Sequence, residues 1–283
     1  MPRRSETALL TLLALVAFAS NSILTRMALG AGAMDAATFT TVRLAVGAFV
    51  LAAIVWGQHG PSPFRGEGGV IGPLALFAYA APFTFAYLRI GAATGALILF
   101  GSVQITMIGW GIATGERPRF RSWVGIAAAG AGLAWLMLPS LRRPDPLGSA
   151  LMVVAGSAWG AYSLAGKKAT NALAANARSF VWAVPLALLV NLIFASSATV
   201  SARGVVLAAV SGGVTSGLGY AIWYRALRGL TATQAGILQL SVPVIAAAGA
   251  VVVLHESVNP RLAVSAAAVI GGLALVLWSP RRE

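Results

Sequence analysis

The sequence predicts an all-α membrane protein whose ten transmembrane helices form an inverted repeat of five plus five. The first observation is composition: 58% of the 283 residues are hydrophobic and 10% are charged, against roughly 45–50% and about 25% in soluble domains. No protein core of this size can hold that surplus, so lipid must be the solvent. The second observation is that the chain matches itself 140 residues further on, with Ile105 at Ile245, Gly109 at Gly249, Glu116 at Glu256 and Arg121 at Arg261.

This repeat divides the chain into two units, residues 1–141 and 142–283. Its length is far from the period of a solenoid, and a duplicated apolar chain is typical of two-repeat transporters. Each unit has an odd number of spans, so the second unit enters the membrane from the opposite face. The repeat is therefore expected to be inverted.

The spans follow from the lengths of the apolar runs, because a helix needs ~20 apolar residues to cross a bilayer. The breaks hold turn residues, such as Gly115 to Pro118 and Asn259-Pro260. Pro82, Pro185 and Pro243 fall inside predicted spans, where each removes a backbone donor and can kink its helix. The ten expected spans are 7–28, 37–56, 70–89, 92–113, 121–138, 148–166, 177–195, 204–224, 232–254 and 261–278.

The loops set the orientation. Thirteen Lys and Arg residues fall near one side of this arrangement and six near the other. Cytoplasmic loops carry the excess of positive charge. Both termini are therefore expected in the cytoplasm.

Several classes of function are excluded by missing features. The chain has no cysteine, which excludes disulfides and thiolate metal sites. The net charge of +13 sits in short loops without interleaved aromatics, so no nucleic-acid partner is expected. The stretch from Gly160 to Lys168 resembles a phosphate loop, but its glycine spacing is too long by one and it lies in an apolar run, so no nucleotide is expected. No catalytic set and no metal cluster can be assembled, and we expect no catalytic residue, metal or cofactor.

The charged residues are informative by position. Proton-driven carriers commonly use an acid inside the membrane, and here the acids avoid the middle third of every predicted span, which favours a facilitator. Glu116 and Glu256 could be gate or coupling charges; we favour an interaction with the dipole of the helix that follows each. Arg43 lies roughly 10 Å inside its span and should face the bundle, face a wet vestibule or snorkel outward, with a substrate carboxylate as an alternative partner. The seven acids are Glu6, Asp35, Glu67, Glu116, Asp145, Glu256 and Glu283.

Uncharged polar residues and aromatic residues share the same depth in several spans. Tyr79, Phe83 and Tyr87 repeat every four residues and so share one helix face. Ordinary packing and interfacial aromatic belts are the alternative explanation, which suits Tyr87 and Tyr224. For the central residues we expect a substrate cavity lined by Asn21, Tyr79, Phe83, Gln104, Trp159, Tyr162, Tyr220, Trp223 and Gln239.

The ten-span plan resembles the drug/metabolite transporter superfamily, specifically its EamA-type exporters. The resemblance covers nearly the whole chain. It departs from the pattern at Val103, where the second half has Pro243. The features that carry it are the turns Gly115-Glu116-Arg117 and His255-Glu256-Ser257, the stretch Ser241-Val242-Pro243, and the pairing of Phe18 to Arg26 with Trp159 to Lys167.

Within that superfamily the chain looks most like the bacterial YddG-type exporters of aromatic amino acids. That resemblance implies an inner-membrane, multi-pass carrier that moves Phe, Tyr, Trp and related metabolites outward by alternating access, and we expect it to work as a monomer. The π surface and the neutral donors and acceptors of the expected cavity suit an aromatic zwitterion. The alternative is a proton-coupled exporter of drugs or cationic metabolites, which would need a buried acid facing the cavity. A membrane enzyme or a channel is a more distant alternative.

Overall fold

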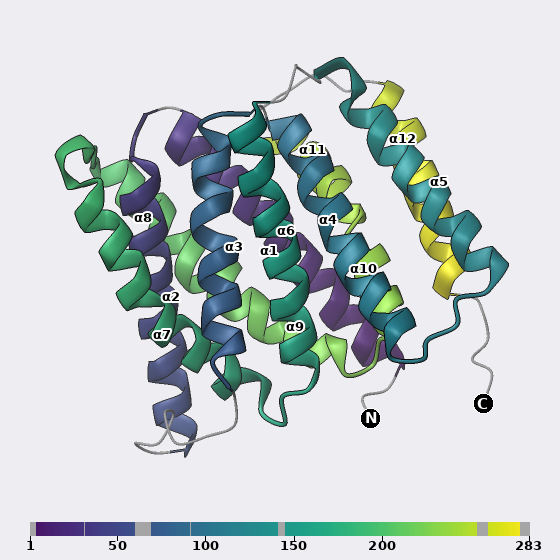
Figure 1. Cartoon of the computed structure of the whole chain (residues 1–283), viewed down its shortest axis with the longest axis horizontal. Coiled ribbons are helices and arrows are strands. Elements are labelled where there is room, and N and C mark those ends of the chain that lie inside the picture. Colours follow the sequence, from purple (N-terminus) through teal and green to yellow (C-terminus); the bar gives the residue numbers. More distant parts are fainter. Residues whose placement is uncertain are drawn as a thin grey trace.

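The computed structural model describes residues 4–30, 32–59, 69–90, 92–140, 145–253 and 260–277, and these are almost entirely helical (Figure 1). An isolated antiparallel bridge joins Met34 and Val200. His255, Glu256 and Glu67 lie outside the described residues. Nine helical stretches of the described chain are long and apolar enough to cross a membrane, and Ile71–Tyr87 is a shorter apolar helix. The predicted fold class is confirmed.

The first five predicted spans are α1 (Arg4–Gly30), α2 (Ala36–His59), α3 (Ile71–Tyr87), α4 (Ala92–Ala113) and α5 (Phe120–Met137), with a 3-10 turn η1 (Leu138–Ser140) after the last. The next two are α6 (Pro146–Lys167) and α7 (Ala172–Ile193), followed by η2 (Ala195–Ser197). The eighth comprises α8 (Ala202–Val210), η3 (Ser211–Leu218) and α9 (Gly219–Leu227). The ninth comprises α10 (Ala232–Leu238) and α11 (Ser241–Val253), and the tenth is α12 (Pro260–Leu277).

The eighth span is not the continuous α-helix that the sequence predicts, because its middle third, η3, is a π-helix. The wider turn lies where Gly212 meets the backbone of α2. A Cβ atom on Gly212 would lie 2.1 Å from the carbonyl oxygen of Arg43, so a larger residue there would push the two helices apart. The glycine-rich sequence of η3 therefore serves a close approach of α2 and the eighth span.

The ninth span is also interrupted, at Gln239 and Leu240 between α10 and α11. Pro243 has no N–H to donate to the Gln239 carbonyl, which instead accepts from the N–H of Val242 at 3.1 Å. Polar side chains satisfy the carbonyls that the break frees: Gln239 Nε2 donates to Ala235 O at 3.2 Å, and Ser241 Oγ donates to Leu238 O at 2.7 Å. The break is stable inside a bilayer because these backbone groups keep partners.

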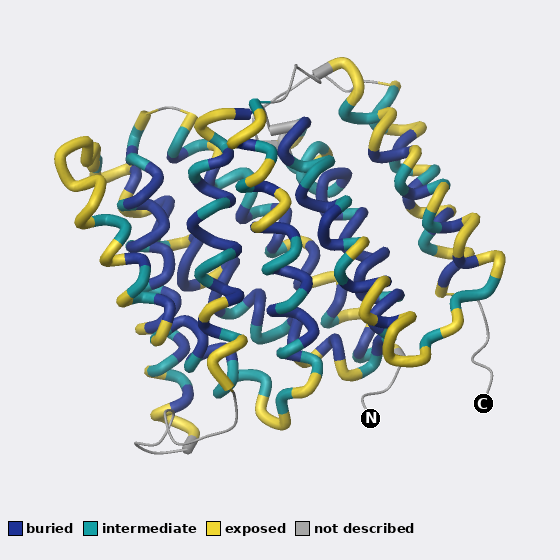
Figure 2. The backbone as a smooth tube through the Cα atoms, viewed as in Figure 1, coloured by how far each residue is buried: buried dark blue, intermediate teal, exposed yellow. Residues whose placement is uncertain are grey.

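The helices pack in pairs that cross between the two halves of the chain. The helix α1 lies against η3, α9 and α11, while α6 lies against α3 and α4. The helix α2 packs on α7, and α5 packs on α12, the pair at the right-hand edge of Figure 1. This edge pair is the least buried of the long helices, and Figure 2 shows exposed residues along it. The division into units 1–141 and 142–283 stays a prediction, which these matched pairings support.

Candidate functional site

A small cavity lies at the centre of the bundle, with a volume of about 30 Å³, far below the roughly 300–1,000 Å³ of sites that take small molecules. Of the nine residues predicted to line a substrate cavity, six border it: Asn21, Tyr79, Phe83, Trp159, Tyr220 and Gln239. Five more complete the wall: Phe18, Ser22, Leu99, Phe100 and Val242.

Aromatic rings from five spans border the cavity. The ring centroid of Trp159 lies 4.7 Å from that of Tyr220, 4.9 Å from Tyr79 and 5.2 Å from Phe18. Phe83 continues the wall along α3, 5.5 Å from Tyr79. These spacings fall in the range of favourable edge and offset ring contacts. These ring contacts leave little free space at the centre of the bundle.

Three pairs of wall residues occupy equivalent positions in the two halves. Phe18 and Trp159 stand 141 residues apart in the sequence, as do Tyr79 and Tyr220. Their ring centroids lie 5.2 Å and 6.5 Å apart. The third pair, Leu99 and Gln239, stands 140 residues apart, and both border the cavity. Residues that meet their own equivalents lie at a two-fold axis, so these contacts put the cavity where two inverted units would join.

The break in the ninth span supplies the polar end of the cavity. Gln239 is fully buried, and its Oε1 accepts a hydrogen bond from the indole N–H of Trp159. Its Nε2 contacts Met107 Sδ at 3.2 Å in addition to the Ala235 carbonyl. The amide therefore fixes the orientation of Trp159 against the cavity.

The π-helix supplies hydroxyl groups that hold Asn21 in the cavity wall. Asn21 Oδ1 accepts from Ser211 Oγ at 2.5 Å, from Thr215 Oγ1 at 3.3 Å and from Ser216 Oγ at 3.5 Å. The Asn21 amide nitrogen makes no hydrogen bond within the described chain, so this donor is available at the cavity wall. Neither Ser211 nor Ser216 was predicted as part of the site.

Three predicted site residues do not border the cavity. Gln104 Nε2 donates to the Gly236 carbonyl at 2.6 Å, so Gln104 joins α4 to α10. Tyr162 donates its hydroxyl to Asn176 Oδ1, and Trp223 donates its indole N–H to Ser163 Oγ at 3.1 Å. The prediction rested on the depth of these residues along their spans, which does not give the direction of each side chain.

Tyr162 belongs to a second aromatic layer with Tyr224. The two ring centroids lie 4.9 Å apart, and the Tyr224 hydroxyl donates to the Tyr162 carbonyl at 3.1 Å. Tyr224 is buried, which agrees with ordinary packing, one part of the alternative explanation given for this residue. Because Tyr162 also contacts Trp159 at 5.6 Å, the layer adjoins the cavity wall.

A larger groove, of about 750 Å³, opens beyond this second layer. It lies between the start of α3, the end of α4, the end of α6 and the start of α7. Tyr224 forms part of its wall, and Lys168 and Arg178 are among its polar residues. The groove lies at the end of the bundle where α1 begins and α12 ends (Figure 1), and where Arg225 at the end of α9 pairs with Glu6 of α1.

Arg43 of α2 lies behind the cavity wall and is 1% exposed. Its Nη2 donates to the Tyr220 hydroxyl at 2.5 Å, and its Nε donates to Ser216 Oγ at 2.9 Å. The guanidinium carbon also lies 5.6 Å from the centroid of the Tyr79 ring. Arg43 was expected to face the bundle, to face a wet vestibule or to snorkel outward, and the structure places it in the bundle interior.

Glu116 caps a helix of the other half. Its two carboxylate oxygens accept from the N–H groups of Ala232 at 2.6 Å and Thr233 at 3.0 Å, at the start of α10. Glu116 was predicted to interact with the dipole of the helix that follows it, which is α5. It does interact with the N-terminus of a helix, but that helix is α10. Burial by itself would raise the pKa of the Glu116 carboxyl, but these donors outweigh it and hold the pKa below its usual range. Glu116 is ionised and engaged, and so poorly placed to relay protons.

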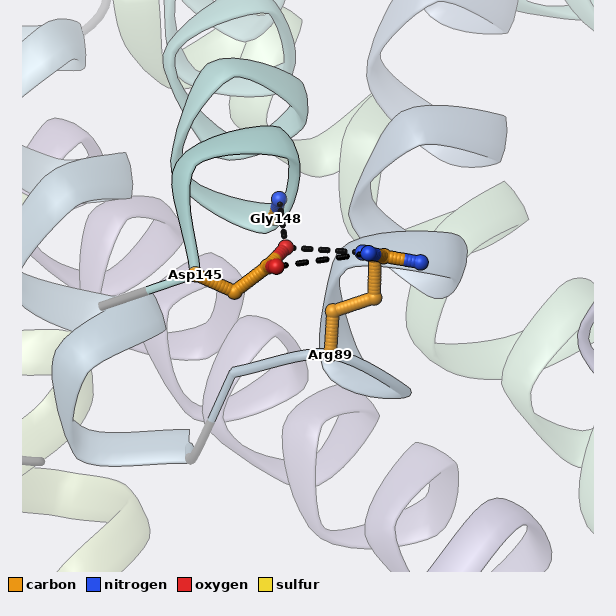
Figure 3. A network of polar contacts seen from close by, with 3 residues as sticks. All are labelled: Arg89, Asp145 and Gly148. Atoms are coloured by element: carbon orange, nitrogen blue, oxygen red, sulfur yellow. Dashed lines mark hydrogen bonds and ion pairs between the residues drawn. The ribbon is translucent and has the colours of Figure 1, made fainter. Parts of the chain in front are cut away.

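The turn after α3 is tied to the second half by an ion pair (Figure 3). Arg89 Nε donates to Asp145 Oδ2 at 2.7 Å, and the same oxygen accepts from the Gly148 N–H at 2.7 Å. These two donors hold the pKa of the Asp145 carboxyl below its usual range. Asp145 thereby caps α6 while it positions the turn between α3 and α4.

Sequence reasoning missed Phe18, which contacts three rings of the central cluster. The signal was present, since Phe18 is the equivalent of Trp159 at the repeat offset. Within the described residues, no group of His, Cys, Asp and Glu side chains could hold a metal ion.

The helices and the central cavity are those of a multi-pass membrane protein, and comparisons with known proteins agree. The sequence pattern of the EamA-like transporter family matches residues 146–278. An uncharacterized protein of Pseudomonas aeruginosa is 45% identical over 282 residues, which cover 99% of this chain and 97% of that protein.

Two uncharacterized transporters are more distant relatives. The transporter of Archaeoglobus fulgidus is 27% identical, over 68% of this chain and 70% of the relative. The transporter of Bacillus subtilis is 25% identical, over 74% of this chain and 73% of the relative. A crystal structure of a protein 20% identical in sequence superposes with a TM-score of 0.80 over 96% of both chains, which shows the same fold. The second half of this chain therefore carries the sequence pattern of the EamA-like transporter family. The protein is a membrane transporter of the drug/metabolite type.

Proposed function

We propose that this protein exports aromatic amino acids and related small metabolites across the bacterial inner membrane by alternating access. The observation that carries the proposal is the central cavity, where the rings of Phe18, Tyr79, Trp159 and Tyr220 meet beside the amides of Asn21 and Gln239. Ring faces suit an aromatic side chain. Amide groups can both donate and accept, as an ammonium and a carboxylate require.

The two cavities fit the alternating-access part of the proposal. Sites that take small molecules usually measure about 300–1,000 Å³, so the 30 Å³ centre is too small for a substrate while the 750 Å³ groove is large enough. Tyr162 and Tyr224 stand between them. We infer that substrate enters by this groove, displaces the two rings and opens the centre.

The topology belongs to the same proposal. Units 1–141 and 142–283 are inverted repeats, both termini are cytoplasmic, and one copy of the chain is sufficient. The groove then faces the cytoplasm, where an exporter takes up its substrate. Single cysteines added to this cysteine-free chain and labelled in whole cells test the orientation, and a periplasmic C-terminus would contradict it.

We propose that transport is not coupled to protons. Among the described residues, the acids lie at helix ends and are engaged, as Glu116 and Asp145 are. The alternative, a proton-coupled exporter of drugs or cationic metabolites, needs an acid at the cavity. The charged residue beside the cavity wall is the buried cation Arg43, which disfavours a cationic substrate.

Counterflow into liposomes tests the function. Purified protein should exchange labelled phenylalanine, tyrosine and tryptophan faster than alanine or threonine. An imposed pH gradient should not make uptake concentrative. If it does, a proton relay exists. If the aromatic amino acids show no exchange above empty liposomes, the substrate assignment is wrong.

Phe83→Ala tests the aromatic wall directly. Loss of a ring contact worth about 0.5–1.5 kcal/mol beyond area burial should weaken aromatic substrates roughly two- to tenfold and leave alanine unchanged. Phe85→Ala is a matched control, because Phe85 lies on the same helix but pairs with Phe194 at 5.0 Å, away from the cavity. Equal effects of the two variants would mean that Phe83 is ordinary packing.

A further inference from the structure

Arg43 is a permanent positive charge in the interior of the bundle. Its side chain is 1% exposed, about two turns into α2. An arginine guanidinium keeps its proton in proteins, so burial cannot neutralise it. A buried charge without a counter-charge is costly in a membrane protein and usually marks a functional site.

Within the part of the chain that the structure describes, the groups that contact this guanidinium are neutral. The Tyr220 hydroxyl and Ser216 Oγ accept from Nη2 and Nε, and the Tyr79 ring lies beside it. Nη1 is buried and has no hydrogen-bond partner. Every acid of the described chain is engaged elsewhere: Glu6 with Arg225, Asp35 with the N–H groups of Thr38 and Thr199, Glu116 with the start of α10, and Asp145 with Arg89.

The unpaired donor lies directly behind the cavity wall. Tyr79 and Tyr220 each border the cavity on one side and contact Arg43 on the other. The cavity volume of about 30 Å³ is too small for an amino acid, so a substrate must displace these rings. When Tyr220 moves off Nη2, the two terminal nitrogens of Arg43 form a free fork, the geometry that binds a carboxylate through two parallel hydrogen bonds.

We propose that Arg43 binds the carboxylate of the transported substrate through Nη1 and Nη2, with the Tyr220 hydroxyl occupying this site in the closed cavity. This inference rests on the proposed function and makes it more specific. The substrates must carry a carboxylate beside an aromatic ring. The matching amines and amides are poor substrates.

The experiment compares acids with their amides. In counterflow with labelled phenylalanine, unlabelled phenylalanine and tryptophan should compete better than phenylalanine amide and tryptophan amide. Arg43→Gln should weaken competition by the acids about tenfold to a hundredfold, as expected for loss of a charged hydrogen-bond partner, and leave the amides unchanged. Arg43→Lys, which keeps the charge but not the fork, should fall between.

Ser216→Ala is the matched control for a purely structural role. It removes the partner of Nε and perturbs the contact between α2 and η3, but it keeps the fork. It should affect acids and amides alike. Thermal unfolding in detergent checks that each variant folds. If Arg43→Gln does not fold, the preference of the wild type for acids over amides still tests the proposal.

Four outcomes overturn the proposal. If Arg43→Gln weakens acids and amides equally, Arg43 is structural. If the wild type prefers the amides, Arg43 does not bind a carboxylate although the proposed function stands. If replacing chloride by gluconate abolishes binding, the counter-charge is an inorganic anion. If the wild type exchanges no aromatic amino acid at all, the proposed function fails, and this inference fails with it.

Discussion

The third and fourth spans and their expected equivalents, the eighth and ninth, differ in backbone. The helices α3 and α4 are continuous α-helices. The eighth span contains the π-helix η3, and the ninth is broken between α10 and α11. All four spans reach the same cavity, so position in the bundle does not account for the difference.

Side chains at equivalent positions do account for it. Ser211, Thr215 and Ser216 of η3 stand where the first half has Val70, Leu74 and Ala75. In the ninth span, Gln239, Ser241 and Pro243 stand where α4 has Leu99, Gly101 and Val103. Polar side chains stabilise an irregular backbone inside a membrane because they take over the freed carbonyls, and only the second half has them here.

Because of this difference, the two halves contribute different groups to the cavity. Both halves contribute rings, as the Tyr79 and Tyr220 pair illustrates. The hydroxyls and the buried amide come from the irregular spans, and transporters of inverted repeats place discontinuous helices at their binding sites. We therefore expect the irregular spans to shape the polar end of the site, together with Asn21 and Arg43 of the first half. The predictions below alter the irregular spans, from the largest expected effect to the smallest.

Gly212→Ala should destabilise the protein most, by about 3 kcal/mol. The new Cβ would lie 2.1 Å from the Arg43 carbonyl oxygen, and backbone cannot move aside as a side chain can. Gly213→Ala is the control, because its Cβ would meet only the Val50 and Val46 side chains, at 3.2 and 3.5 Å. Thermal unfolding in detergent measures both. Equal losses would mean that η3 does not depend on its contact with α2.

Glu116→Ala should destabilise the protein by about 2 kcal/mol, because it leaves the Ala232 and Thr233 N–H groups at the start of α10 without acceptors. Glu116→Gln keeps one acceptor and should lose about half as much. Gly115, with φ of 96°, forms the turn that presents this carboxylate, so Gly115→Ala should give a similar loss through backbone strain. If Glu116→Ala unfolds at the wild-type temperature, the cap contributes nothing.

The same contact predicts a pH dependence. The pKa of Glu116 is lower in the folded protein than its usual value of 4.5, so the unfolded chain takes up this proton first as the pH falls. The stabilisation is complete above about pH 4.5 and is lost as the pH falls toward the folded pKa. Unfolding measured from pH 6 to pH 3 should show a smaller loss in Glu116→Gln. A wild type and variant with the same pH profile would contradict this.

Gln239→Leu gives the ninth span the residue of its equivalent, Leu99. It should destabilise by about 1–2 kcal/mol, because the Trp159 indole N–H and the Ala235 carbonyl both lose their partner. It should also slow transport of every amino acid, since Trp159 loses its fixed orientation. The reverse change, Leu99→Gln, adds an amide to the other half. If it restores transport in the double variant, either half can supply the polar end.

Pro243→Val has the smallest expected effect, within about 1 kcal/mol. It gives the ninth span the residue found at Val103 and restores an N–H that can bond the Gln239 carbonyl. Gln239 and Ser241 should still hold the break, so stability changes little. Hydrogen exchange at residues 239–243 should slow. If transport changes strongly while hydrogen exchange at these residues stays the same, the ring of Pro243 itself is required for transport.

The sequence indicated six of the residues that border the cavity, but it could not separate them from three others that point elsewhere. The depth of Asn21, Tyr79 and Trp159 followed from counting along apolar runs, and all three border the cavity. Gln104 and Trp223 lie at suitable depths but point to Gly236 and Ser163. Side-chain direction depends on how each helix is rotated against its neighbours, and apolar runs facing both lipid and protein carry little periodic signal for that rotation.

The sequence by itself determined the solvent, the number of spans and the match between two halves, because these depend on length, hydropathy and spacing along one chain. Tertiary structure decided the rest. It placed Phe18 against its equivalent Trp159, joined Glu116 to a helix 116 residues away, and left Arg43 with an unpaired donor behind the cavity wall. These arrangements depend on residues that are far apart in the sequence. The sequence allows many such pairs, and the packing of the helices decides which of them form.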